Sequence, residues 1–232
     1  MKRGESDMQT AGIVLAVLFA VTLVLMHRRD RHALRTERGK LFDACLALFE
    51  GHRVTQDAVA WPVLAGTYGG YDVHIAPLVD DVVFRKVPSL WLLVTVKRKL
   101  PIAGRVDMLA RAQNTEFYSP ADGLPVRIAT PHEWPRQMTI KADRPAAELP
   151  FAALDPHVRA FFADPRTKEM LVTGEGVRIV YQAHGADRSE YLVLRRAVFR
   201  DARLPAALVG SLLDQAVQVC AAVIKGGVHG QA

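Results

Sequence analysis

Acidic and histidine side chains gather in one short stretch of the chain, residues 72–81. Asp72 and His74 are two positions apart, so both point to the same side of an extended strand, and Asp80 and Asp81 follow them. Carboxylate and imidazole groups exchange protons and bind metal ions. Because a metal site usually needs three or four converging ligands, an exposed strand face that ends in an acidic turn explains the same pattern. We therefore keep Asp72 and His74 as the catalytic candidates, and we expect neither a metal ion nor another cofactor.

The signature motifs of several common enzyme classes are missing from the sequence. It contains no phosphate-binding glycine loop followed by Gly-Lys-Ser/Thr, no His-Glu-x-x-His, no Gly-x-Ser-x-Gly and no Cys-x-x-Cys. These absences argue against the recognisable forms of those activities. A hydrolase with scattered acids and histidines stays open as an alternative.

A long apolar stretch lies near the first residue of the chain. Residues 11–26 carry no charge, and with Gln9 and Thr10 the stretch reaches the length of helix that crosses a hydrocarbon core of about 30 Å. A cleaved signal peptide would need small residues after the apolar run, but here Met26 is followed by a basic cluster. A helix that is apolar on all sides is also hard to place in a small soluble domain. We predict a short tail over residues 1–9 and a transmembrane helix, a signal anchor, over residues 10–26.

Charge next to the predicted span indicates its orientation. Lys2 and Arg3 precede the span, whereas residues 27–40 hold six basic and two acidic side chains. Since the more basic flank usually stays in the cytoplasm, we expect a single-pass protein of a bacterial inner membrane with its large domain in the cytoplasm. The residues of this flank that we expect to contact lipid headgroups are Arg28, Arg29, Arg31 and Arg35.

The same count decides between lipid and nucleic acid as a partner. The net charge of the chain is +6, and residues 27–40 contribute six positive minus two negative charges, or +4, of this excess. The basic segment over residues 27–40 therefore lies beside the membrane, where it is attracted to anionic lipids. We expect the lipid bilayer to be a partner and nucleic acid not to be one.

The rest of the chain predicts an α+β domain over residues 41–225, followed by a tail over residues 226–232. We expect helices where apolar residues recur every three or four positions and strands where they alternate or run without interruption. The expected helices cover residues 31–51 with a joint at Gly39, 106–113, a helix beginning at Asp155, and 205–224. The expected strands cover residues 59–65, 71–75, 90–96, 117–118, 126–128, 138–141, 169–173, 177–182 and 191–199.

Two features of this arrangement bear on packing. The continuous apolar strand at residues 90–96 suggests a central strand covered on both faces, and the helix at residues 205–224 should pack across the sheet. A helix, a glycine-containing hairpin and a long strand follow one another at residues 41–97 and again at 155–199, which suggests a duplicated unit.

The two cysteines and the tryptophans give further expectations. Cys45 and Cys220 lie in apolar helical patterns, so we expect buried reduced thiols, with a disulfide as the alternative if the domain is outside the cell. Trp91 lies in an apolar strand and should belong to the core, whereas Trp134 lies in an irregular loop and should be exposed for partner contact. Arg85 is a further residue that we expect to contact a protein partner.

Lys86 is expected in the same contact surface. With residues 97–99 and 195–196, Arg85 and Lys86 would form a basic face at the ends of neighbouring strands, although solvated strand ends are the simpler explanation of these charges. Together these features favour a membrane-anchored, non-catalytic interaction module that acts as a subunit or assembly factor with a membrane or cytoplasmic protein partner. The alternatives are the membrane-bound hydrolase and a lipid-binding domain in which the C-terminal helix covers a cavity.

Overall fold

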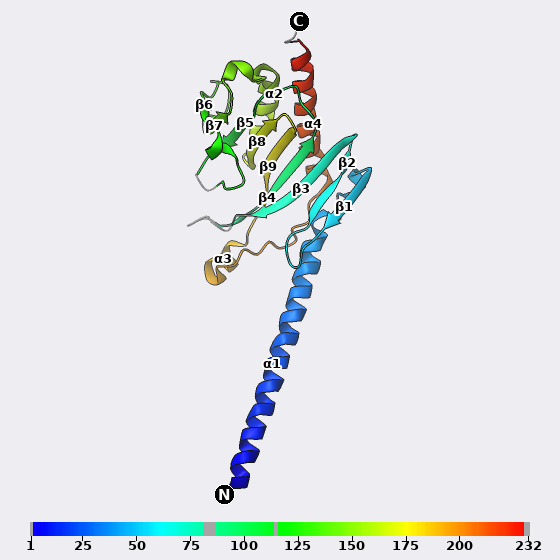
Figure 1. The fold of residues 1–232 in the computed structure, drawn as a ribbon, viewed down its shortest axis with the longest axis vertical. Helices are drawn as coiled ribbons and strands as arrows, with labels where there is room; N and C mark the ends of the chain where they lie inside the picture. The colour runs from blue at the N-terminus through cyan, green and yellow to red at the C-terminus, as the bar shows by residue number, and fades with distance from the viewer. Residues whose placement is uncertain (1, 81–86, 114–115, 230–232) are drawn as a thin grey trace.

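The protein consists of one long N-terminal helix and one domain built on a single antiparallel sheet (Figure 1). The structure is a computed structural model that describes residues 2–80, 87–113 and 116–229. Its helices are α1 (Lys2–Gly39), α2 (Phe151–Phe162), α3 (Arg188–Leu194) and α4 (Ala206–His229). Its strands are β1 (Gly51–Thr55), β2 (Val63–Tyr68), β3 (Tyr71–Val79), β4 (Ser89–Lys97), β5 (Val106–Ala110), β6 (Val126–Ile128), β7 (Met138–Ala142), β8 (Thr167–Thr173) and β9 (Gly176–Gly185).

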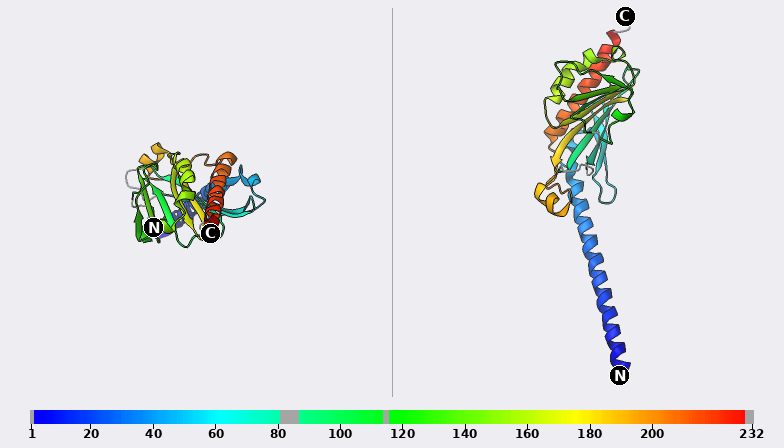
Figure 2. Two further views of the ribbon diagram at one scale, coloured as in Figure 1. Left: turned by 90° about the horizontal axis from the view of Figure 1, so that it is seen from above. Right: turned by 90° about the vertical axis from the view of Figure 1, so that its left-hand side faces the viewer.

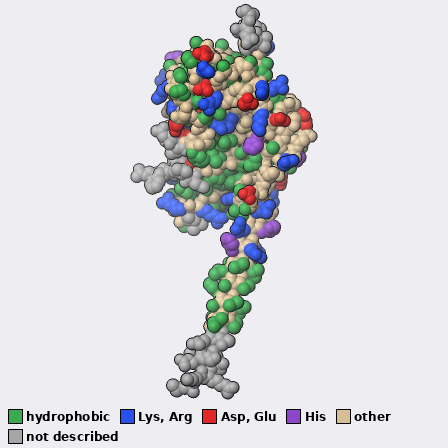
Figure 3. Space-filling view, in the orientation of Figure 1, with side chains coloured by type: hydrophobic (Ala, Val, Ile, Leu, Met, Phe, Trp, Pro, Cys, Tyr) green, Lys and Arg blue, Asp and Glu red, His purple; other side chains and the backbone are tan. Residues whose placement is uncertain are grey.

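Helix α1 extends away from the domain, and its apolar part is not buried against any other described part of the protein. The large apolar side chains between Ile13 and Met26 are about half exposed or more, and they form a continuous apolar surface in Figure 3. Among the described residues, α1 and α4 are the two helices long and apolar enough to cross a membrane, but α4 is partly buried in the domain. The helix also includes residues 2–9 and 27–39, although the sequence analysis predicts a separate tail before the span and a separate basic segment after it.

The C-terminal end of α1 continues directly into the core. The helix ends at Gly39, near which Gln56 Nε2 donates a hydrogen bond to the carbonyl oxygen of Arg35 (3.0 Å), one of the groups that a helix end leaves unpaired. Short 3₁₀ turns follow, and Leu41 and Phe42 are each 1% exposed. The expected helix over residues 31–51 is therefore wrong beyond Gly39, because tight turns bring the next apolar side chains into the core.

The nine strands form one sheet in the order β1-β2-β3-β4-β9-β8-β5-β7-β6, in which every neighbouring pair is antiparallel. Helices α2 and α4 pack on each other and cover one face (Figure 2). The even-numbered residues of β4, from Leu90 to Val96, are fully buried beneath this layer, whereas the odd-numbered ones are half-buried on the other face. The expectation that both faces of this strand are covered is wrong, because the helices gather on one side of an antiparallel sheet. The predicted α+β class is confirmed.

Helix α4 packs against α2, β4 and β9, as its narrow polar stripe predicts. Its residues Leu213, Ala216 and Val219 are fully buried. Cys220, on the same helix, and Cys45 are free and buried, and burial raises the pKa of each thiol to about 11.

Several local expectations are wrong. Residues 106–110 form strand β5 and not a helix, because β7 and β8 pair with it on both sides. Residues 117–118 form a turn, and strand β1 at the edge of the sheet is missing from the sequence prediction. Helix α2 begins at Phe151, four residues before Asp155, and includes Pro156.

The segment expected as a strand at residues 191–199 contains most of helix α3. The signal for this helix is present in the sequence: the side chain of Asp187 accepts a hydrogen bond from the backbone N–H of Glu190, as a helix N-cap does. The helix ends at Leu194, and the next residue, Arg195, has a left-handed φ of 52°. Since the second unit has no long strand at this point, the expected duplication of a helix-hairpin-strand unit is not present.

Candidate functional site

The sheet face opposite α2 and α4 is partly covered by the segment that follows β5, residues 111–125. Several hydrogen bonds attach the described part of this segment to the sheet. Arg178 Nη2, from β9, donates to the carbonyl oxygen of Tyr118 (3.0 Å), and the hydroxyl of Ser119 donates to the carboxylate of Asp107 on β5. The segment therefore buries polar side chains that would otherwise be on an open sheet face.

Two acidic side chains are completely buried beneath this segment. Asp107 on β5 and Glu169 on β8 are both 0% exposed and lie on the same face of adjacent strands. Arg178 donates to both carboxylate oxygens of Glu169, with Nη2 3.0 Å from Oε2. Within the described part of the chain, Oδ1 of Asp107 accepts no hydrogen bond.

These surroundings shift the pKa of both acids upward. Burial is the largest cause; it raises the pKa of Asp107 to about 6 and, together with repulsion from Asp107, that of Glu169 to about 7. The positive charge of Arg178 opposes both shifts. The two carboxyl groups therefore keep a proton between them close to neutral pH.

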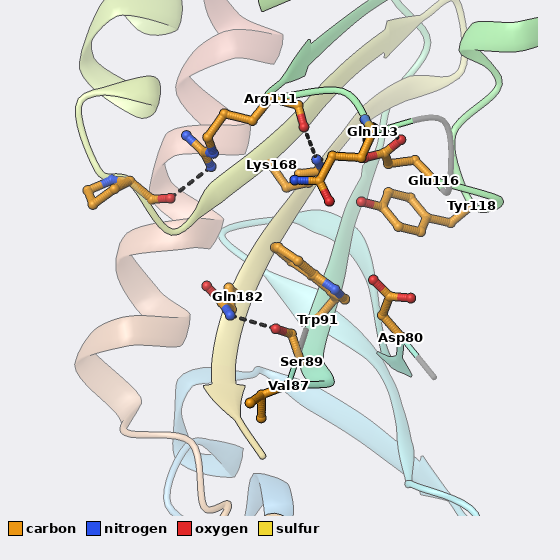
Figure 4. Close-up of a pocket in the computed structure, with 11 residues that line it drawn as sticks. Asp80, Val87, Ser89, Trp91, Arg111, Gln113, Glu116, Tyr118, Lys168 and Gln182 are labelled. Atoms are coloured by element: carbon orange, nitrogen blue, oxygen red, sulfur yellow. Dashed lines mark hydrogen bonds and ion pairs between the residues drawn. The ribbon is translucent and has the colours of Figure 1, made fainter. Parts of the chain in front are cut away.

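Beside this pair, a polar cavity of about 180 Å³ opens on the same face of the sheet. Strands β4 and β9 form one wall, the segment after β5 forms another, and Asp80 stands at the end of β3; the side chains converge from these elements (Figure 4). The lining residues are Asp80, Val87, Ser89, Trp91, Arg111, Gln113, Glu116, Tyr118, Pro165, Lys168 and Gln182.

Most of the polar groups in this cavity hold one another in place. Lys168 Nζ lies 2.7 Å from Glu116 Oε1 and donates to the carbonyl oxygen of Arg111 at 2.8 Å. The Arg111 guanidinium donates to the carbonyl oxygen of Pro165 (2.8 Å). The cavity thus has fixed polar walls suited to binding, and its cationic groups already have structural partners.

Trp91 forms part of the cavity wall. Its side chain is half-buried on the open face of the sheet and not in the core, because position 91 belongs to the odd-numbered set of β4. Its indole Nε1 is buried and donates to no group among the described residues. Gln182, opposite it in the β4–β9 register, donates to the Ser89 hydroxyl (2.6 Å). The indole N–H is therefore the donor that a bound molecule could engage.

The catalytic candidates Asp72 and His74 lie together on the same face of β3, as their spacing predicts, but not at this cavity. They face Lys97 and Thr95 of β4, and burial together with the charge of Lys97 lowers the pKa of His74. Asp80, which does line the cavity, is six residues beyond His74, a distance of about 20 Å at the rise of a strand. No group of three or more acidic, histidine or cysteine side chains suited to a metal ion occurs among the residues that the structure describes. Asp81 lies outside the described residues, and the catalytic role of Asp72 and His74 stays a prediction.

The expectation that Trp134 is exposed is wrong. Its side chain is 3% exposed, packs against Phe151 of α2, and donates from Nε1 to Asp155 Oδ1 at 2.7 Å. The irregular loop folds onto α2, so the tryptophan fixes the loop and is not available to a partner. Arg85 and Lys86, the other expected contact residues, lie outside the described residues.

Phe117 is an exposed aromatic side chain that the sequence analysis missed. It is 61% exposed in the segment over the open face, between Glu116 and Tyr118, which line the cavity. Nothing in its local sequence distinguishes it from a buried strand residue. The basic flank of Arg28, Arg29, Arg31 and Arg35 is exposed along α1 directly after the apolar stretch.

Comparison with known proteins assigns no family. No family model matches the chain, and no curated protein matches it. A solved structure, that of the mycobacterial trehalose monomycolate transport factor A, TtfA, is similar to it with a TM-score of 0.37 and 13% sequence identity, over 84% of this chain and 95% of that chain. At this level of similarity, the likeness assigns no activity to the chain.

Proposed function

We propose that this protein is a single-pass, membrane-anchored, non-catalytic interaction module, a subunit or assembly factor of a membrane complex. The observation that carries the proposal is that α1 exposes an apolar segment and continues directly into the core of the domain. Its apolar part is exposed to the surroundings, and the residues that follow its end, Leu41 and Phe42, are buried in the core. The anchor and the domain are thus one continuous body, which suits a protein that presents a surface at a defined distance from the bilayer.

The length of α1 gives this distance. Gly39 is thirteen residues beyond Met26, which corresponds to about 20 Å of helix. The charge difference across the span favours the cytoplasmic side of the inner membrane for the domain. The C-terminal end of α4 lies at the far end of the domain from α1 (Figure 1), so a tag placed there would project away from the membrane.

Binding fits the cavity on the open face better than catalysis does. Its ionic groups are engaged with one another, and Asp72 and His74 do not line it. Phe117, between two lining residues, offers the exposed aromatic surface that concentrates binding energy at protein interfaces. A protein partner that contacts Phe117 would also cover the cavity.

The test is extraction of the native membrane in mild detergent, followed by capture through a C-terminal tag and identification of the proteins recovered. We expect a stoichiometric membrane complex. Phe117→Ala should reduce recovery of the partner at least tenfold, because an aromatic anchor commonly contributes about 2 kcal/mol or more. Val54→Ala is the matched control, since Val54 is also an exposed apolar residue, 38% exposed, on edge strand β1.

Two results would contradict the proposal. If the protein is recovered alone, the membrane-bound enzyme becomes the better hypothesis. If a complex is recovered but Phe117→Ala and Val54→Ala retain equal amounts of partner, the open face is not the contact surface.

A further inference from the structure

A second, larger cavity lies at the end of the domain from which α1 leaves. Its volume is about 690 Å³, within the range of pockets that bind small molecules. It is bounded by the end of α1, the segment before β2, the end of β3, and α3 with the residues that follow it. It shares no lining residue with the cavity on the open face.

The walls of this cavity combine positive charge with aromatic surface. Three arginines line it, Arg38, Arg195 and Arg196, and none of its described lining residues is acidic. Trp61 and Tyr191 supply aromatic surface. A planar guanidinium pairs with phosphate through two parallel N–H donors, so this composition favours a phosphate group attached to an apolar body.

Two of the arginines are already oriented by aromatic rings. The guanidinium of Arg38 lies 5.1 Å from the ring centroid of Trp61 and donates to the carbonyl oxygen of Val59. Arg195 lies 5.9 Å from the ring centroid of Tyr191. Cation–π stacking of this kind reduces the freedom that each side chain would lose when an anion binds.

Helix α3, beside the cavity, exposes apolar side chains toward solvent. Leu192 is 57% exposed and Val193 is 79% exposed, and Arg195 and Arg196 directly follow the last residue of the helix. Apolar residues flanked by arginines on a short helix are typical of a segment that lies in the interface of a bilayer.

The position of α3 brings it near the membrane. Arg38 is twelve residues beyond Met26, about 18 Å along the helix, which places it outside a headgroup layer of several ångströms. Figures 1 and 2 show α3 at the end of the domain from which α1 leaves, so α3 lies closer to the bilayer than the sheet does. Figure 3 shows Lys and Arg side chains gathered at the same end.

We propose that this cavity binds the headgroup of an anionic phospholipid of the bilayer. Leu192 and Val193 enter the interface, and Arg195 and Arg196, which follow α3, hold the phosphate group. The domain then has a second attachment to the membrane besides α1, and this attachment depends on lipid charge. The site lies apart from the protein-contact surface around Phe117, so either proposal can fail without the other.

The test uses the full chain in nanodiscs of phosphatidylcholine with or without phosphatidylglycerol. Val193→Cys carries an environment-sensitive fluorophore; Cys45 and Cys220 are 0% exposed and do not compete for the label. Ala160→Cys, exposed on α2 at the opposite end of the domain, is the control position. We expect the emission at position 193 to shift to the blue when phosphatidylglycerol is present, and the emission at position 160 to stay unchanged.

Charge variants identify the arginines responsible. Arg195→Gln with Arg196→Gln should lower the insertion equilibrium about 25-fold, because each arginine near an anionic surface contributes about fivefold. Arg127→Gln with Arg144→Gln removes the same charge from exposed positions on and after other strands and should have no effect.

Each other outcome overturns the proposal. A label at position 193 that does not shift, or that shifts equally without phosphatidylglycerol, excludes an anionic lipid. Equal effects of the two double variants mean that only net charge matters. If inorganic phosphate added to nanodiscs of phosphatidylcholine alone gives the same shift, the cavity takes free phosphate and not a lipid headgroup.

Discussion

Replacing Asp107 by Asn tests whether the two buried acids beneath the segment after β5 share a proton. Asp107 and Glu169 are both 0% exposed on adjacent strands, and Arg178 forms its ion pair with Glu169. Asn has nearly the size of a protonated Asp, and its side-chain N–H groups can donate to a carboxylate as a protonated carboxyl group does. The variant therefore fixes the pair in its protonated form.

The sign and size of the effect follow from the pKa shift. Burial raises the pKa of Asp107 from 3.8 to about 6, a shift of about two units, each worth about 1.36 kcal/mol. Because the native state binds this proton more tightly than the unfolded chain does, the stabilisation is complete below about pH 4 and is lost as the pH rises through 6. Asp107→Asn should match the wild type at pH 4 and exceed its free energy of unfolding by about 1 to 3 kcal/mol at pH 8.

The measurement is urea unfolding of the full chain in mild detergent, followed by circular dichroism from pH 4 to pH 8. Glu169→Gln is the contrasting variant: it leaves the half-buried Arg178 without its carboxylate, and we expect a loss of about 3 to 5 kcal/mol at pH 8, where Glu169 is ionised in the wild type. If Asp107→Asn lowers the free energy of unfolding by the same amount at every pH, Asp107 is ionised throughout and the reasoning is refuted.

Two further substitutions test local packing by the same unfolding measurement. Trp134→Phe keeps the ring in its pocket but removes the hydrogen bond to Asp155, so the free energy of unfolding should fall by about 1 to 3 kcal/mol; no change would mean that water replaces the bond without cost. Gly176→Ala should cost well over 1 kcal/mol, because φ at this position is +143° and an added Cβ would lie 2.1 Å from the carbonyl oxygen of Val96. Gly123→Ala, where an added Cβ meets nothing, is its control.

Local sequence patterns correctly predict the elements that are apolar throughout or along one regular stripe. The uncharged stretch before Met26, the hairpin of β8 and β9, and the apolar helix α4 all occur where their periodicity places them. These elements are either apolar throughout or apolar along one regular stripe, so the pattern determines them without knowledge of their neighbours.

Elsewhere the pattern is ambiguous. All five residues of β5 are buried, Asp107 among them, because helices cover one face and the segment after β5 covers the other. A strand buried on both faces shows no alternation, and a helix fits the same letters. The apolar run of α3 also fits either a strand or a helix, and the N-cap at Asp187 favours the helix.

The sequence by itself determines that the protein has an apolar N-terminal helix, a basic flank and an α+β domain, because hydrophobicity and charge along one segment are local properties. Only the tertiary structure decides which side chains meet. It separates Asp72 and His74 from the cavity on the open face, buries Trp134 against α2, and leaves Phe117 exposed. It also brings Arg38 to the arginines that follow α3, more than 150 residues away in the sequence. Such encounters depend on strand register and on the layer that covers each face, and neither is encoded in the spacing of a single segment.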